Sequence, residues 1–118
     1  MKWDTKTPCK SCPYRKDAKL GFWHAQEFID LLHNDEDGGF TAPLYGCHGS
    51  AKQAEPSICA GWLLDQKGRM ENIQLRLALL QSQEARDCFD AVSCDVELYG
   101  SLREMVMVNL KAMRGEEE

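Results

Sequence analysis

The sequence CKSCPYR, residues 9–15, contains two cysteines separated by two residues and followed directly by a proline. Cys47, in the run YGCHG, and Cys59, in the run ICAGW, add two more thiols in glycine-containing, turn-like contexts. Four thiolates suffice for one tetrahedral metal site. The pattern therefore predicts that Cys9, Cys12, Cys47 and Cys59 bind one metal, and that the first half of the chain folds around it.

Two kinds of metal group satisfy this set of cysteines. Zinc suits any four-cysteine geometry in a rigid fold. A 4Fe-4S cluster also takes four cysteines, which can be spread along the chain as one close pair and two distant single residues. We expect zinc, because it is the more common occupant of small structural sites, and keep the cluster as the alternative.

We do not expect the nearby histidines and Arg15, or the remaining two cysteines, to be metal ligands. His48 follows Cys47 directly, and we expect it in the wall of the site rather than as a ligand, with His24 a weaker rival ligand. Four thiolates around a divalent zinc leave a charge of about −2, which Arg15 would compensate. The remaining two cysteines do not have the spacing of a ligand pair, so we expect core or surface thiols at Cys88 and Cys94.

The chain has 118 residues and a formal charge of −5, which predicts one small domain that does not coat DNA through its overall charge. We divide residues 1–118 into a cysteine half at 1–66, a helical half at 67–114 and a flexible acidic tail at 115–118. Residues 1–20 carry a net charge of +4, so the rest of the chain carries −9. The cysteine pair thus lies in a basic segment attached to an acidic body.

Hydrophobic spacing predicts a mainly α fold, with four to five helices and an irregular metal-bound N-terminal half. We expect helices over about 24–33, from Cys59 to near Gly68, over 71–81, after Ser82 and after Ser101. Ser101 and Glu104 match a capping box. The residues expected to face the core are Met70, Ile73, Leu77 and Leu80, widened by Leu75 and Leu79, in the third helix; Ala85, Cys88, Phe89 and Val92 in the fourth; and Leu102, Met105, Val106, Leu110 and Met113 in the fifth.

The chain carries an ordered series of motifs that resembles an uncharacterised family of small proteins from bacteria and their phages: CKSCPYR (9–15), GFWH (21–24) with EF (27–28), CH (47–48), CAGW (59–62) and LRLA (75–78). The resemblance covers about residues 8–80. It implies that Cys9, Cys12, Cys47, His48 and Cys59 belong to one site, and it supplies no activity. The segment from Ser82 onward lies outside the matched pattern, so we expect an addition specific to this protein that carries a partner surface.

These observations predict a metal-stabilised binding or regulatory module of phage type that engages a host protein or, through residues 1–20, nucleic acid. The alternatives are an iron-sulfur protein for electron transfer or redox sensing and a thiol oxidoreductase that uses Cys9 and Cys12. We expect a non-enzyme, because four ligands close the coordination sphere and no catalytic motif is present. The absence of a leader and of a long apolar run predicts a cytoplasmic protein without a membrane partner.

Overall fold

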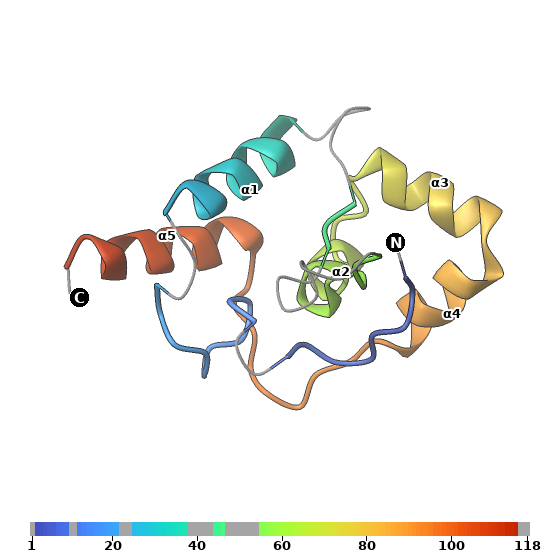
Figure 1. The fold of residues 1–118 in the computed structure, drawn as a ribbon, viewed down its shortest axis with the longest axis horizontal. Helices are drawn as coiled ribbons and strands as arrows, with labels where there is room; N and C mark the ends of the chain where they lie inside the picture. The colour runs from blue at the N-terminus through green and yellow to red at the C-terminus, as the bar shows by residue number, and fades with distance from the viewer. Residues whose placement is uncertain (1, 10–11, 22–24, 38–43, 47–54, 116–118) are drawn as a thin grey trace.

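The computed structural model describes residues 2–9, 12–21, 25–37, 44–46 and 55–115, and Figure 1 shows their arrangement. This part of the chain contains five helices and no strand longer than a single bridge: α1 (Ala25–Asp37), α2 (Ala60–Lys67), α3 (Ile73–Gln81), α4 (Gln83–Ala91) and α5 (Leu102–Met113). α1 packs along α5, α3 and α4 form a helical hairpin, and α2 lies between the two pairs. The predicted mainly α fold with an irregular N-terminal half is confirmed.

Polar side chains cap four of these helices. The Cys59 sulfur, the Asn72 amide oxygen, and the hydroxyl oxygens of Ser82 and Ser101 each accept a hydrogen bond from a backbone N–H in the first turn of α2, α3, α4 and α5. Such bonds satisfy N–H groups that have no partner within the helix. The predicted caps at Ser82 and Ser101 are confirmed.

Two helix boundaries differ from the prediction. α1 continues to Asp37 instead of ending at His33, because the polar run at 34–37 contains no glycine or proline that would break a helix. α3 begins at Ile73 instead of Glu71, because Asn72 adopts an extended backbone and its side chain accepts from Leu75 N at 2.8 Å. Asparagine at an N-cap sets the first helical residue.

The predicted inner face of α3 is only partly correct, since Met70 and Leu79 pack against the core as expected. Leu75 is completely buried, whereas Leu77 and Leu80 are 42% and 77% exposed. Leucines surround much of this short helix, so their spacing alone does not single out one face. In α5 the buried face of Leu102, Met105 and Val106 is as predicted, but Met113 is exposed.

Backbone hydrogen bonds join the irregular N-terminal segments to the C-terminal half. Arg15 pairs with Leu98 in an antiparallel bridge, flanked by bonds from Tyr99 N to Tyr14 O and from Lys16 N to Glu97 O. Further along the chain, Gly21 N donates a hydrogen bond at 2.9 Å to the side-chain oxygen of Asn109, which is buried in α5. The segment 97–109 therefore holds residues 14–21, which follow the cysteine pair.

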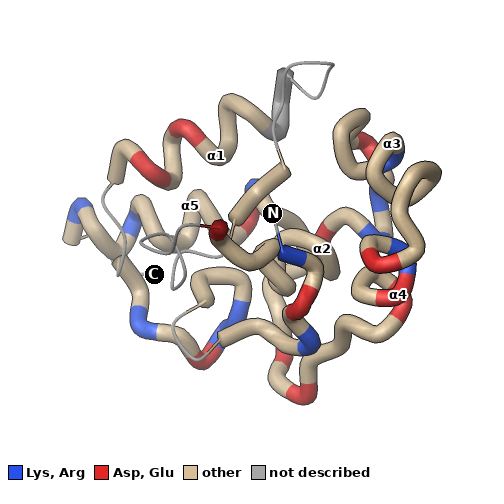
Figure 2. Tube along the Cα trace, turned by 45° about the vertical axis from the view of Figure 1, so that its right-hand side comes forward, with Lys and Arg blue, Asp and Glu red and all other residues tan. Residues whose placement is uncertain are grey.

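The basic N-terminal segment does not form a uniform positive surface. The guanidinium of Arg15 pairs with Asp17, and the ammonium of Lys16 pairs with Glu97 at 2.7 Å. Figure 2 shows Lys and Arg positions interspersed with Asp and Glu positions along the described chain. Folding thus brings Glu97 of the acidic body to the basic segment, and Asp17 pairs with Arg15 within it. None of the helices in the described part of the chain has the length and apolar character needed to cross a bilayer.

Leu75 is buried and Leu80 is exposed in the same helix, so substitutions at these two leucines test the orientation of α3. We expect Leu75→Ala to lower the free energy of unfolding by about 2–5 kcal/mol, because it leaves a cavity in the core. Leu80→Ala removes the same atoms from an exposed site and should change it by less than about 0.5 kcal/mol. Urea unfolding followed by circular dichroism measures both. Equal losses in the two variants would contradict the observed orientation of α3.

Candidate functional site

Cys12 and Cys59 are brought together beneath the first turn of α2. Both side chains are buried, each with 4% of its surface exposed, and their thiols are in hydrogen-bond contact. Cys12 is held by a tight turn in which Cys12 N donates to Cys9 O and Arg15 N donates to Cys12 O, each at 3.0 Å. Cys59 is held as the N-cap of α2. Two of the four predicted ligands therefore come from separate segments to one place.

The surroundings of the two sulfurs stabilise negative charge. The hydrogen bond from Cys59 lowers the pKa of Cys12, and burial opposes this effect. Backbone N–H groups of Tyr14 and Gly61 and the charge of Arg15 lower that pKa further. Trp62 N donates to the Cys59 sulfur at 3.4 Å, at the positive end of the α2 dipole. Thiolates are the form in which cysteine binds a metal.

Gly61 permits the close approach of the two segments. A Cβ at this position would lie 2.7 Å from the Cys12 sulfur and 2.8 Å from Cδ2 of Tyr14, which are distances that real Cβ atoms do not tolerate. The loop that carries Cys12 therefore packs directly on the backbone of α2. The sequence CAGW contains this requirement, because only glycine lacks the atom that would clash.

The Arg15 guanidinium lies beside the cysteine turn. Its Nε and Nη2 donate to the Asp17 carboxylate at 2.8 Å, and its Nη1 donates to Pro8 O at 3.2 Å. These bonds fix the guanidinium beside the cysteine turn, where its charge acts on Cys12. The hydrogen bonds to Asp17 are the main cause that raises the pKa of Arg15, and Cys94 adds to the rise, a proximity that the sequence did not predict.

The structure describes only some of the other predicted site residues. Cys9 is exposed and contributes its carbonyl to the turn with Cys12. Cys47, His48 and His24 lie outside the described residues. Within the described ranges no three histidine, cysteine or acidic side chains form a metal-ligating group. The set of four ligands stays a prediction, of which the Cys12–Cys59 contact is the observed part.

The segment that precedes Cys47 pairs with the segment that precedes Cys59. Gly46 and Ile58 form an antiparallel bridge, and Cys59 N donates to Tyr45 O at 2.9 Å. Residues 45–46 thus run beside Ile58 and Cys59. The residue before Cys47 is thus adjacent to the residue before Cys59.

Cys88 matches its predicted place in the core. It lies on the buried face of α4, where its thiol donates to Thr5 O at 3.3 Å. Cys94 is partly exposed, in the connection between α4 and α5.

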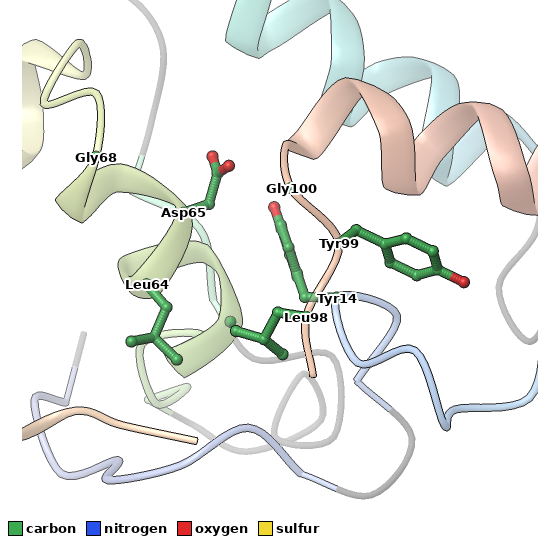
Figure 3. A pocket seen from close by; sticks show the side chains of 8 residues that line it. Tyr14, Leu64, Asp65, Gly68, Leu98, Tyr99 and Gly100 are labelled. Carbon is green, nitrogen blue, oxygen red and sulfur yellow. The ribbon is translucent and has the colours of Figure 1, made fainter. Parts of the chain in front are cut away.

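A cavity of about 160 Å³ is lined by Tyr14 and Gly61, whose backbone N–H groups lie close to the Cys12 sulfur (Figure 3). Tyr14 points into the space between α2 and the segment before α5, while Tyr99 points away. Burial raises the pKa of Tyr14 well above its usual range, so its hydroxyl stays protonated, and it has no hydrogen-bond partner among the described residues. The residues that line the cavity include Leu64, Asp65, Leu98 and Gly100.

A family model for a family of unknown function, DUF6283, matches residues 4–117. The chain belongs to this family. No curated protein and no solved structure matches the chain. The family model extends across α3, α4 and α5, so the expectation that the segment from Ser82 onward is an addition outside the family pattern is wrong. The contacts of residues 93–99 with the cysteine loop agree with this result.

Substitution at Gly61 tests the packing of the cysteine loop on α2. We expect Gly61→Ala to lower the free energy of unfolding by about 1–3 kcal/mol, because the added methyl group overlaps Cys12 and Tyr14. Gly68→Ala is the control, since its nearest neighbour would be 4.0 Å away. Chemical denaturation measures both, and a Gly61→Ala protein as stable as the control would contradict the close approach.

Proposed function

We propose that this protein is a small binding module whose fold is fastened by one zinc ion at Cys9, Cys12, Cys47 and Cys59. The observation that carries the proposal is the buried contact between the Cys12 and Cys59 thiols. Two thiols from distant segments that meet beneath a helix N-terminus, with backbone N–H groups directed at their sulfurs, are suited to hold a cation between them.

The local backbone supports the remaining two ligands. The turn from Cys9 to Cys12 is closed by a hydrogen bond between these residues, as in a metal-binding knuckle. The bridge between Gly46 and Ile58 supports Cys47 as the fourth ligand, because consecutive Cα atoms are only about 3.8 Å apart. Arg15 would offset part of the negative charge of a zinc ion bound by four thiolates.

Four ligands leave no open position for substrate, so the proposed role of the metal is structural. A 4Fe-4S cluster on the same cysteines is the competing occupant, and it would make the protein a redox module. The oxidoreductase alternative is less well supported, because Cys12 is hydrogen bonded to Cys59 and no strand precedes the CKSC turn among the described residues.

The proposed binding partner is a protein. Nucleic acid requires cations that are free to approach phosphate. In segment 1–20, Arg15 and Lys16 are each paired with a carboxylate of this chain. The phage origin, the regulatory role and the cytoplasmic location that the sequence suggests belong to the same proposal.

Elemental analysis and an ultraviolet-visible spectrum of anaerobically purified protein test the metal. We expect about one zinc per chain and no visible absorption band. About four irons per chain with a broad visible band would show that the site holds a 4Fe-4S cluster instead of zinc. Protein that folds with neither metal would overturn the proposal.

Cysteine variants test the ligands. We expect Cys12→Ser and Cys59→Ser to lose the metal and to lower Tm by more than about 10 °C, because metal-binding energy in such a domain is folding energy. Cys94→Ser is the control and should keep full metal content. An unchanged Tm in both ligand variants would contradict the structural role of the metal. Loss of metal in Cys94→Ser would show that the proposed ligand set is wrong.

A further inference from the structure

A groove of about 270 Å³ lies between the N-terminal segment and α4. Figure 1 shows this segment passing beside α4, on the side of the molecule that carries the α3–α4 hairpin. Trp3, Cys88 and Ala91 provide its apolar lining. We call this hollow the α4 groove.

Hydrogen bonds along the N-terminal segment hold one wall of the α4 groove. Lys2 pairs with Ser57, and Ser93 N donates to Lys6 O at 2.9 Å. Between these points, Thr5 Oγ1 donates to Ile58 O, and the Cys88 thiol donates to Thr5 O. The wall is therefore formed before any partner binds, which reduces the entropy that binding must overcome.

The rim of the α4 groove is acidic. Asp4, Glu84 and Asp87 line it against a single cation, Lys6. Elsewhere in the described chain Asp17, Asp65 and Glu97 are paired with cations, whereas the carboxylates of Asp4 and Glu84 take part in no hydrogen bond or ion pair of the described residues.

Two of these carboxylates also act on the Cys88 thiol at the bottom of the groove. Burial is the main cause that raises the pKa of the Cys88 thiol, and the carboxylates of Asp4 and Glu84 add to the rise. A ligand that placed a positive charge at the rim would face three carboxylates. Its apolar portion would cover Trp3 and Ala91 at the same time.

We propose that the α4 groove binds an arginine or lysine side chain within a basic segment of a partner protein. These side chains combine an aliphatic stem with a terminal cation. The stem fits the apolar lining, the cation fits the acidic rim, and the indole of Trp3 adds a favourable face for a cation. The inference rests on the proposed role as a binding module, and none of the residues that line the groove is a proposed metal ligand.

Two synthetic peptides test the charge preference. The full-length ¹⁵N-labelled protein, as purified, is titrated with acetyl-Gly-Arg-Leu-Arg-Gly-amide and with its acidic counterpart, acetyl-Gly-Glu-Leu-Glu-Gly-amide. We expect the basic peptide alone to shift amide resonances, concentrated at residues 2–6 and in α4, and its Kd to rise with added salt. Equal shifts with both peptides, or shifts spread evenly over the acidic surface, would overturn the proposal.

Variants of α4 locate the site. The double variant Glu84→Gln/Asp87→Asn should raise the Kd by about five- to twentyfold, because exposed ion pairs are individually weak. Asp90→Asn removes one carboxylate of the same helix that does not line the groove, so it should change the Kd by less than about twofold. Ala91→Trp should abolish binding by filling the groove from the last residue of α4, where a larger side chain does not enter the core.

Three results would count against the α4 groove. An Asp90→Asn protein weakened as much as the double variant would show that only overall charge matters. Undiminished binding in Ala91→Trp would place the peptide elsewhere. Sedimentation that reveals a dimer, with groove resonances that depend on protein concentration, would make a second copy the occupant. Metal content is measured separately, so failure of peptide binding is distinguishable from failure of the zinc proposal.

Discussion

The contact between the Cys12 and Cys59 thiols constrains how the two parts of the chain meet. It requires Cys12 and Tyr14 to lie directly on the first turn of α2, which in turn requires a residue without Cβ at position 61. Tyr14 is then buried beside α2, and its carbonyl is in place to accept from Tyr99 N. Residues 97–99 are fixed by that pairing, and α5 follows after Ser101. A substantial part of the fold thus depends on one pair of sulfurs.

Sequence reasoning succeeded where the signal is local. A serine before an apolar run caps a helix regardless of what surrounds it, and Ser82 and Ser101 do so. The prediction failed where tertiary packing decides which of several apolar helix faces is buried. The leucines of α3 offer several apolar faces, and contact with the core selects Leu75 over Leu77 and Leu80. For the candidate site, spacing predicted that Cys12 and Cys59 belong together, but the bridge from Arg15 to Leu98 joins distant segments and leaves no local pattern.

The charge distribution along the sequence differs from the charge distribution on the molecule. Residues 1–20 are basic in the sequence, yet folding brings Glu97 to Lys16 and the turn brings Asp17 to Arg15. The acidic excess of the body is concentrated by the same folding, because Asp4 of the N-terminal segment comes beside Glu84 and Asp87 of α4. A basic segment in sequence therefore contributes a carboxylate to an acidic groove in space.

Thr5 links the candidate metal site to the α4 groove. Its hydroxyl donates to Ile58 O, one residue before Cys59, and its carbonyl accepts from the Cys88 thiol at the base of the groove. A metal that fixes Cys59 would fix Ile58 as its neighbour, and through Thr5 it would restrain the wall of the groove. Because a rigid wall lowers the entropic cost of binding, loss of the metal would weaken peptide binding even though no ligand contacts the peptide. The two proposals are thus separate in their chemistry and connected through the hydrogen bonds that Lys2 and Thr5 make with residues 56–58.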